Sequence, residues 1–495
     1  MFIHQPFIGV FSLCVVYITM GGRHIVKGSV PSSEDVLPGF CEGFSYSPES
    51  GIFLPKKIAA SPSATKLDLG SHFEIRCSIY PSSGEGVGGQ FKDCLSQISR
   101  ILTAQGVDRK NIVQFTVFLP SDGFLWNREA AASVLGDFLH ESGFIPPTSF
   151  IGQTPSHGKM TCLESVILTP KENISLKIRH EHIPQVDVDY SAAEVGGHRW
   201  MWGGGLEGHG PDTKTSCVRA FSLLADVLAR EGMSFQHIVS QKNYVDSICH
   251  RNYNDFNVVR AAAYRRGGLV DGFPSATGIG TVTGVPGHFV MEFVAYDGVR
   301  EPLDNDWQRP AHKYDREWLE QQARGVGASI GGSLSSSTGL SVDTPKFSRG
   351  LYLPESGVFL VSGTASIIGT KIQHTMDEPK EMRIDDLADA FVGRGVGGSG
   401  FEVVADAGGR FVVQTTSAVE AQTWQTLKII NHLLAQRDMS VADIRQLRVY
   451  VKHIGDVNRV SEICRKVLGD VPTICVNGSV CYEDMLVELE GLAKK

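Results

Sequence analysis

The sequence predicts an α+β protein in which one structural unit occurs three times in tandem. Three blocks that align without a gap carry the prediction: ILTAQGVDRKNIVQFTVFL from Ile101, VLAREGMSFQHIVSQKNYV from Val227 and LLAQRDMSVADIRQLRVYV from Leu433. Each block has the pattern of an amphipathic helix end, a short polar turn and an alternating strand. Similar blocks in a fixed order are typical of internal repeats.

Two further blocks follow each copy and complete the unit. The first reads IPPTSFIG from Ile145, FPSATGIG from Phe273 and VPTICVNG from Val471. The second is an apolar strand with an acid, namely Leu163-Glu164-Ser165, Met291-Glu292-Phe293 and Val487-Glu488-Leu489. A turn and strand also recur upstream, as PESGIFL from Pro48 and PESGVFL from Pro354. The predicted unit is therefore strand pair, helix, strand, helix, strand.

The blocks divide the chain into several predicted parts. These are an N-terminal extension at residues 1–37, units at 38–172, 173–300 and 340–495, and a linker at 301–339. The linker ends in a Gly/Ser run with little apolar surface to bury. The third unit also carries an insertion at about residues 377–409, whose Gly-rich core favours a flexible loop.

Composition and charge restrict the class of protein. A net charge of −8 without a Lys/Arg cluster argues against nucleic acid as a partner. The ten cysteines form no CxxC pair, which favours a reducing, cytoplasmic location and argues against a zinc site. The apolar stretch from Phe7 to Met20 lacks a basic flank and a cleavage site, and it is short for a membrane span. We expect a strand or an extension there, with a targeting segment as the alternative.

The closing strand of the third unit places an acid within an apolar run. Alternation puts Val487 and Leu489 on one face, and Glu488 and Glu490 on the other. A carboxyl group inside a protein is costly unless it has a partner or stays protonated. A protonated acid in a closed pocket is also what general-acid catalysis needs. The alternative is an acid on the solvated face of an edge strand.

The order of these elements, closing in VELEGLA from Val487, resembles the Rid/YjgF family. Members of that family are α+β domains with a chorismate mutase-like βαβ arrangement, a mixed sheet backed by two helices. They usually form trimers with a ligand pocket at each subunit interface. The resemblance therefore implies a single-chain pseudo-trimer of three tandem units, with pockets between the units.

A narrower resemblance, over residues 190–495, is to the chorismatases. Five motifs carry it: Phe347-Ser-Arg349, VSGTASIIG from Val361, LRVYVK from Leu447, PSATGIG from Pro274 and LVELEG from Leu486. Residues 1–172 match only the general Rid pattern. Chorismatases hydrolyse chorismate to pyruvate and a cyclic acid, which is a dihydroxycyclohexadiene carboxylate in one subgroup and 3-hydroxybenzoate in another.

The resemblance implies that Glu488 is the general acid, because it falls where the family has its catalytic acid. Protonation of the enolpyruvyl methylene carbon gives an oxocarbenium ion, after which the ether bond is cleaved. Glu164 and Glu292 align with Glu488 in the repeat, so the acid is partly structural, or three pockets exist of which one is active. Their neighbouring motifs differ from the family's pocket, which favours a single site served by Glu488.

The resemblance also implies a set of substrate-binding residues. Arg349 matches the family's Phe-x-Arg, whose guanidinium holds a carboxylate through a bidentate fork. Lys452 stands where the family usually has Arg, and a lysine keeps the charge but loses that fork. Tyr244 and Arg260 match positions near the pocket. Two threonines within the matched motifs, Thr364 and Thr277, complete the set.

Two positions bear on the product. Cys481 lies seven residues before Glu488, and Gly363 lies in SGTAS from Ser362. In the family, Cys and Gly at these places accompany 3-hydroxybenzoate, whereas Ala at both accompanies the dihydrodiol. Glycine leaves room for another ring pose, and a polarizable thiol suits an oxygen transfer that excludes water.

The leading hypothesis is an enzyme that cleaves chorismate without a cofactor or a metal. Its partner is then a small cyclic enolpyruvyl acid, with no membrane or nucleic acid, and the chain is a monomer or a small homo-oligomer. One alternative is a Rid-type hydrolase of enamines or imines, although Thr473-Ile-Cys-Val-Asn-Gly lacks the Arg of such sites. Another is a protein that binds a small metabolite without catalysis.

Overall fold

The computed structural model describes residues 44–47, 52–55, 64–140, 142–249, 251–284, 288–324, 342–387, 403–405 and 411–495. The chain divides into two compact units, Met1–Ala59 and Ala60–Lys495. In the first, β1 (Phe44–Ser47) and β2 (Ile52–Pro55) form an antiparallel pair. The predicted extension at 1–37 and the Gly-rich core of the predicted insertion lie outside the described residues.

The compact unit that starts at Ala60 contains three large sheets with the same order of elements. The first sheet has the strand order β3-β4-β7-β5-β6. Its elements are β3 (Ala64–Asp68), β4 (His72–Ile79), α1 (Gly86–Gln105), β5 (Ile112–Leu119), α2 (Phe124–Leu139), β6 (Thr148–Gly152) and β7 (Cys162–Pro170).

The second sheet has the strand order β12-β11-β13-β10-β9-β8. Its elements are β8 (Leu176–Ile183), β9 (Val188–Val195), β10 (His198–Gly208), α3 (Thr213–Arg230), β11 (Ile238–Asp246), α4 (Arg251–Arg266), β12 (Ser275–Thr281) and β13 (Phe289–Tyr296). Each of the three sheets pairs one strand in parallel, β5 with β6, β11 with β12 and β22 with β23.

The third sheet has the strand order β14-β15-β16-β24-β22-β23. Its elements are β14 (Glu301–Leu303), β15 (Gly350–Leu353), β16 (Val358–Thr364), α7 (Ala418–Ala435), β22 (Ile444–Val451), α8 (Val457–Leu468), β23 (Thr473–Asn477) and β24 (Val487–Lys494). The remaining elements are α5 (Arg316–Arg324), β17 (Ile367–Ile368), β18 (Lys371–Ile372), β19 (Lys380–Arg383), β20 (Val403–Ala405) and β21 (Phe411–Thr415).

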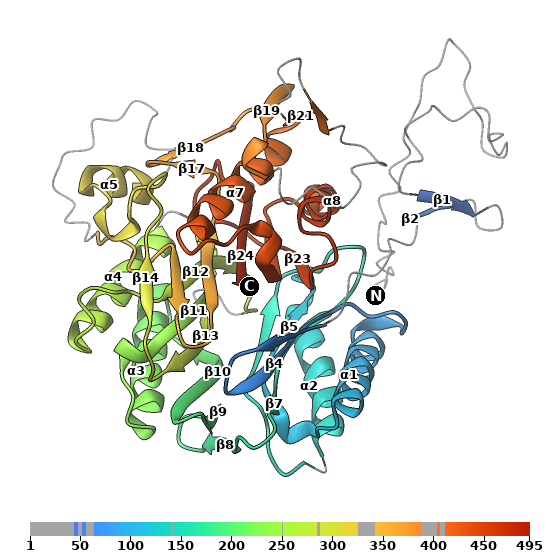
Figure 1. Ribbon diagram of the computed structural model, residues 1–495, viewed down its shortest axis with the longest axis vertical. Coiled ribbons are helices and arrows are strands. Elements are labelled where there is room, and N and C mark those ends of the chain that lie inside the picture. Colours follow the sequence, from blue (N-terminus) through green and yellow to red (C-terminus); the bar gives the residue numbers. More distant parts are fainter. Residues whose placement is uncertain are drawn as a thin grey trace, which may run out of the picture. The chain divides into compact units, whose positions relative to one another are not determined.

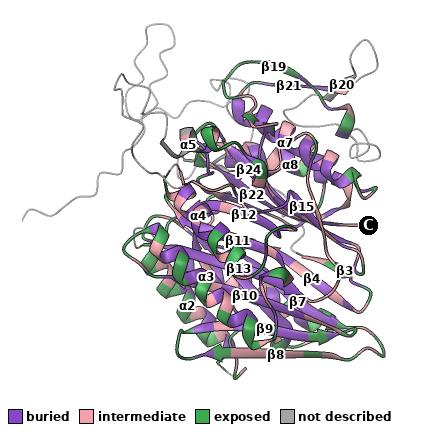
Figure 2. Cartoon of the chain, turned by 90° about the vertical axis from the view of Figure 1, so that its left-hand side faces the viewer, coloured by how far each residue is buried: buried purple, intermediate pink, exposed green. Residues whose placement is uncertain are grey.

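The predicted α+β class is confirmed, since each of the three large sheets contains parallel and antiparallel pairs and is accompanied by two helices. Figure 1 shows α1 beside α2 and α3 beside α4, each pair along one side of its own sheet. Burial follows this layering, because the strands are mostly buried while the helices α2 and α3 alternate between buried and exposed faces (Figure 2). Helix α1 illustrates the cause, since its buried side chains Phe91, Leu95, Ile98 and Leu102 recur at three- and four-residue spacing.

The strand registers of the three sheets agree residue by residue. A bulge follows the first residue of β5, β11 and β22, and each strand is preceded by a 3₁₀ turn. Beyond the bulge, the facing pairs are Thr116 with Glu164, Lys242 with Glu292, and Arg448 with Glu490. The helix–strand blocks read from the sequence therefore align as predicted.

The same registers correct one part of the sequence alignment. Glu164 and Glu292 correspond to Glu490, not to Glu488 as expected. The counterparts of Glu488 are Cys162, which faces Phe118, and Val290, which faces Tyr244. The prediction slipped by two residues because Glu488 and Glu490 lie on the same face of β24, and a shift of two residues keeps every side chain on its face. An acid at position 488 is thus a feature of the third sheet and not of the repeat.

Adjacent sheets meet along corresponding elements. Strand β6 lies against β10, β12 against β16, and β23 against β4. The first two boundaries have equivalent hydrogen bonds from a glycine amide to a hydroxyl side chain. Gly205 N donates to Ser149 Oγ at 2.8 Å, and Gly363 N donates to Thr277 Oγ1 at 3.0 Å. These boundaries are where clefts between sheets can form.

The stretch predicted as a linker is partly structured. Its first residues form β14, which pairs with β15 at the edge of the third sheet, and α5 follows. Residues 325–339 lie outside the described part. No helix among the described residues is both long and apolar enough to cross a membrane. The cysteines that the structure describes are all free thiols.

Candidate active site

A pocket lies at the boundary between the second and third sheets and contains most of the predicted site residues. It encloses about 490 Å³ of space not filled by atoms, its open mouth included. Its lining comprises Tyr253, Phe256 and Arg260 from α4, Ala276 and Gly278 from β12, and Tyr314, Phe347, Arg349, Gly363, Ala365, Ile367, Cys481, Tyr482, Met485 and Glu488. Five of the nine predicted residues therefore meet in one place, namely Glu488, Cys481, Arg349, Arg260 and Gly363.

Glu488 is a buried acid on an interior strand. Strand β24 lies between β16 and β22, so the alternative of a solvated edge strand is wrong. The side chain is 5% exposed, and no described residue donates a hydrogen bond to its carboxyl group. Burial, with a smaller contribution from Glu490, raises the pKa of Glu488 to about 8, although Arg349 acts in the opposite direction. Glu488 is therefore mostly protonated at neutral pH.

Gly363 provides the space that the carboxyl group of Glu488 occupies. It lies in an irregularity of the β16–β24 pairing, between Val361 and Thr364. A Cβ added at Gly363 would overlap Oε1 of Glu488 and would lie 2.9 Å from the methyl group of Thr277. The absence of a side chain at position 363 thus fixes where the acid sits.

Two arginines bring positive charge to the same pocket. Arg349 is 3% exposed and donates from Nη2 to the hydroxyl of Tyr314 at 2.7 Å and to the carbonyl of Arg309 at 3.0 Å. Arg260 is 1% exposed and donates to Asn257 Oδ1 at 2.7 Å. Both guanidiniums lie over the ring of Phe347, at 5.2 and 5.8 Å from its centroid.

Neither arginine has a carboxylate partner among the described residues. The Nε atoms of Arg260 and Arg349 are buried without a hydrogen-bond partner. Burial lowers the pKa of Arg260, which shows the cost of holding this charge away from water. Buried cations are normally paired, so a pocket with two unpaired guanidiniums and a protonated acid is built for an anionic ligand.

Cys481 and a group of aromatic side chains close the pocket. Cys481 is 7% exposed and forms a hydrogen bond with Tyr253. Burial, and then Glu488, raise the pKa of the Cys481 thiol well above its usual value, so the sulfur stays protonated. Tyr482 packs edge-to-face against Tyr253 and Trp318, with ring centroids 5.6 and 5.3 Å apart.

The other four predicted residues lie outside the pocket lining. Lys452 is partly exposed and its Nζ donates to the carbonyl of Glu483. Thr364 Oγ1 donates to the carbonyl of Ser362 at 2.8 Å. Thr277 lies just behind Gly363, where its Oγ1 accepts from the Gly363 amide and donates to Glu490.

Tyr244 belongs to a buried cluster around Arg448 that the sequence did not reveal. Arg448 forms ion pairs with three acids, one from each large sheet. They are Glu164 of the first sheet, Glu292 of the second at 3.8 Å and Glu490 of the third at 3.3 Å. The Tyr244 hydroxyl donates to Glu292 Oε2 at 3.2 Å and accepts from Arg448. Burial opposes the charge on Arg448, but Glu164 and its neighbours hold the pKa of this guanidinium well above its usual value. We call Arg448, Glu164, Glu292 and Glu490 the Arg448 cluster.

Several lining residues were also missed from the sequence. Tyr253, Phe256 and Arg260 recur at three- and four-residue spacing, which places them on one face of α4. That helical pattern could have identified Tyr253 and Phe256 once Arg260 was chosen. Tyr314 gave no signal, because it comes from the stretch predicted as a linker.

The α+β fold with a pocket between two sheets agrees with the solved structure and the relatives to which this chain is similar. A chorismatase crystal structure matches with a TM-score of 0.50 at 18% identity, covering 78% of this chain and 93% of that one, which supports a shared fold. No protein-family model matches the chain.

The curated relatives confirm the resemblance to chorismatases. The chain is 26% identical over 294 residues to a 3-hydroxybenzoate synthase of Streptomyces hygroscopicus, covering 57% of this chain and 68% of that protein. It is 26% identical over 262 residues to a chorismatase of the same organism, covering 50% of this chain and 59% of that protein. The relatives are enzymes, in agreement with the prediction that this chain is one.

Proposed function

We propose that this protein cleaves chorismate to pyruvate and a cyclic acid, with 3-hydroxybenzoate as the expected ring product. The observation that carries the proposal is the pairing of a protonated acid, Glu488, with two buried guanidiniums that lack carboxylate partners, Arg260 and Arg349. Chorismate carries two carboxylates and an enol ether, and the ether must be protonated on carbon before it breaks. The similarity to a 3-hydroxybenzoate synthase supports the same substrate class.

In the proposed mechanism the arginines hold the carboxylates of the substrate and Glu488 supplies the proton. Transfer of that proton to the methylene carbon gives an oxocarbenium ion next to the ether oxygen. An acid with a pKa near 8 keeps its proton at neutral pH, and the positive charge of Arg349 stabilises the carboxylate that forms when Glu488 gives that proton to the substrate.

The fate of the ether bond then decides the product. For 3-hydroxybenzoate, the ring hydroxyl of the substrate adds to the oxocarbenium carbon and gives its proton to the Glu488 carboxylate. The bond between that oxygen and the ring then breaks, pyruvate leaves with the oxygen, and the proton that the ring loses as it becomes aromatic goes to the oxygen that stays on the ring. That route needs no water in the balance, because chorismate is the sum of its two products. For the dihydroxycyclohexadiene carboxylate, water adds to the oxocarbenium carbon and its proton returns to Glu488. The hemiketal formed then breaks its bond to the ring oxygen, which takes the hemiketal proton, and pyruvate and the ring diol are released.

Cys481 and Gly363 have supporting parts in this proposal. The thiol of Cys481 is protonated, so it lines the pocket as a polarizable wall and weak hydrogen-bond donor and not as a nucleophile. Gly363 leaves the space for the acid. Thr277 supports Gly363 from behind, whereas Tyr244, Thr364 and Lys452 are not assigned substrate contacts in this mechanism.

We also propose that the three sheets act as a single-chain pseudo-trimer of Rid-like units. The shared element order, the identical registers and the corresponding sheet boundaries support this proposal. Light scattering should then give the 53.8 kDa mass of one chain or a small multiple at working concentration. Dissociation of a proteolytically cut chain into separately folded thirds would contradict the proposal.

The activity test is direct. Purified protein is incubated with chorismate, pyruvate is followed with a coupled lactate dehydrogenase assay, and the ring product is identified by chromatography. We expect pyruvate and 3-hydroxybenzoate in equal amounts. Binding of chorismate without pyruvate release, while a known chorismatase works in parallel, would overturn the proposal in favour of a metabolite-binding protein.

A further inference from the structure

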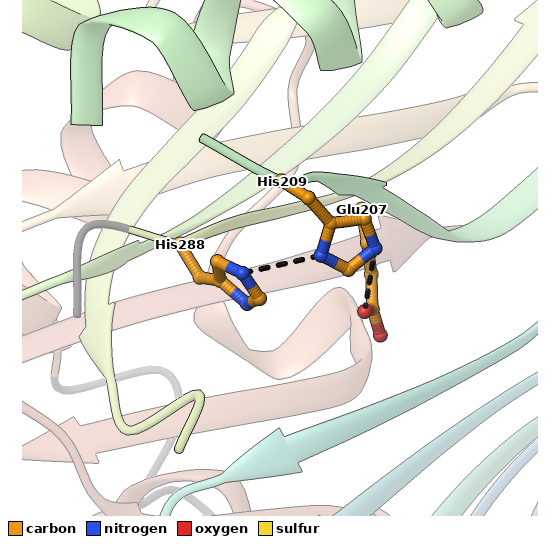
Figure 3. A group of neighbouring side chains, drawn as sticks. All are labelled: Glu207, His209 and His288. Atoms are coloured by element: carbon orange, nitrogen blue, oxygen red, sulfur yellow. Dashed lines mark hydrogen bonds and ion pairs between the residues drawn. The ribbon is translucent and has the colours of Figure 1, made fainter. Parts of the chain in front are cut away.

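Three side chains able to ligate a metal meet where β10 ends and β13 begins. They are Glu207, His209 and His288 (Figure 3). His209 Nδ1 lies 3.1 Å from His288 Nε2, and His209 Nε2 lies 3.6 Å from Glu207 Oε2. One ligand atom from each residue falls within 4.8 Å of the others, and the described residues contain one such set.

This set occupies a defined place at the boundary between the first and second sheets. The registers of β10 with β13 and of β16 with β24 make Leu206 the counterpart of Thr364. Glu207 and His209 therefore correspond to Ala365 and Ile367, which line the candidate active site. The second sheet thus carries polar ligands where the third sheet carries an apolar pocket wall.

The surroundings orient the carboxylate without using all of it. Arg128, from α2 of the first sheet, lies with Nη2 2.6 Å from Glu207 Oε1. Arg128 Nη1 also donates to Glu207 Oε2 at 3.3 Å, so the arginine holds both oxygens and fixes the orientation of the group. Each carboxylate oxygen has two lone pairs, and Oε2 also faces His209, so one lone pair of Oε2 remains for a cation. A hydrogen-bonded neighbour of this kind commonly positions a metal-ligating carboxylate.

The nitrogen separation fits shared coordination. Zinc binds histidine at about 2.0–2.1 Å, so two nitrogens in a tetrahedral site lie about 3.3 Å apart. The 3.1 Å between His209 Nδ1 and His288 Nε2 is close to that value. His209 is largely exposed, which gives an ion access.

We propose that Glu207, His209 and His288 form a divalent-metal site of the zinc class at the boundary between the first and second sheets. Histidine nitrogen with one carboxylate oxygen is a ligand set that zinc accepts, and three protein ligands leave a fourth position for water or a ligand. The sequence alone gave no metal spacing, because His288 lies 79 residues beyond His209. The site is separate from Glu488 and does not depend on the proposed chorismate chemistry.

The test uses the purified full chain after chelator treatment. Zn²⁺ is titrated by calorimetry and by competition with a chromophoric chelator. We expect one ion per chain, and binding weakened by at least about 100-fold in His209→Ala, which removes a ligand outright. Co²⁺ in place of Zn²⁺ should give the visible absorption of a low-coordinate nitrogen and oxygen site, and His209→Ala should abolish it.

Controls separate a built site from surface binding. His182→Ala removes another exposed histidine with a carboxylate neighbour, Asp189 at 3.0 Å, and should bind Zn²⁺ like the wild type. Glu488→Gln should also bind normally. Because His288 is buried, His288→Ala is checked by circular dichroism, and His209→Ala decides the question if that variant does not fold. Equal weakening in His182→Ala and His209→Ala, or no saturable binding, would mean an adventitious ion only and overturn the proposal.

Discussion

Glu488 and Glu490 lie two residues apart on the same face of β24, and each is 5% exposed, yet their surroundings differ completely. Glu490 accepts a hydrogen bond from Tyr450 at 2.9 Å and from Thr277, and it lies 3.3 Å from Arg448. Glu488 has no such donor among the described residues, and burial raises its pKa to about 8.

Hydrogen-bond and charge partners, and not burial alone, therefore decide the protonation state of a buried acid. An acid surrounded by donors and a cation joins a stabilising network and is fixed there. A buried acid without such partners keeps its proton at neutral pH, so it can donate that proton to a bound substrate. The repeat supplies the first kind at all three equivalent positions, whereas the second kind occurs at position 488.

The largest effect is expected from exchanging each acid for its amide. Glu488→Gln should fold normally and reduce kcat for pyruvate release from chorismate by about 10²–10⁴-fold, because an amide cannot deliver the proton. Glu490→Gln is the matched control. It should lower thermal stability while keeping most activity per folded molecule. Wild-type turnover in Glu488→Gln would show that Glu488 is not the general acid.

Removal of the cation in the Arg448 cluster should mainly affect folding. Arg448→Met leaves three buried carboxyl groups without their guanidinium, which costs about 3–5 kcal/mol in comparable buried pairs. Denaturant unfolding measures the loss. Arg199→Met, which breaks a half-exposed pair with Asp297 at 3.0 Å, is the control and should cost about 1 kcal/mol or less. Equal losses of unfolding free energy in the two variants would show that the Arg448 cluster stabilises the protein no more than a half-exposed ion pair does.

Adding one methyl group beside Glu488 should displace the acid. Gly363→Ala places a Cβ against Oε1 of Glu488, and a displacement of about 1 Å can lower turnover by up to about 10²-fold. Gly136→Ala, in α2 with open space around it, should have no effect on turnover. Steady-state kinetics on both variants decides, and unchanged kcat and product ratio in Gly363→Ala would show that the acid tolerates the methyl group.

The smallest effect is expected at Lys452. Its Nζ is engaged with the carbonyl of Glu483 outside the pocket lining, so Lys452→Met should change KM for chorismate by less than about twofold. Arg349→Met is the comparison, since its buried guanidinium lines the pocket and its loss should raise KM strongly. A large KM increase for Lys452→Met would show that this lysine binds the substrate, as the sequence predicted.

The sequence was sufficient to predict the repeated unit because the periods of helices and strands are local properties. The blocks from Ile101, Val227 and Leu433 fall on α1–β5, α3–β11 and α7–β22, and the α+β class followed from them. Alternation likewise put Glu488 on the face opposite Val487 and Leu489, which lie in the apolar core. Alternation could not fix register, because a shift of two residues leaves every side chain on the same face.

Contacts between distant segments were beyond the reach of the sequence. Glu164 and Arg448 are 284 residues apart, and Tyr314 reaches Arg349 from a stretch with a linker's composition. Arg260, Arg349 and Cys481 were found through motifs of a known family, whereas Tyr253 and Tyr482 carried no separate motif. Three-dimensional convergence of this kind depends on how the sheets meet.

The raised pKa of Glu488 also has a consequence for stability. A glutamate in the unfolded chain ionises near 4.3, whereas this one holds its proton to about 8 in the folded protein. The folded state therefore binds more protons in that interval, and this contribution to stability is lost as the pH rises from about 4.3 to 8. Glu488→Gln should flatten that part of the stability profile.

The most direct test is an infrared titration of the Glu488 carboxyl group. The difference spectrum between wild type and Glu488→Gln isolates the carbonyl band of the protonated acid, followed from acid to alkaline pH. We expect this band to be present at neutral pH and to disappear with a midpoint near 8, in step with the loss of pyruvate-releasing activity. A band already absent at neutral pH, with a midpoint near that of an ordinary glutamate, would contradict this expectation.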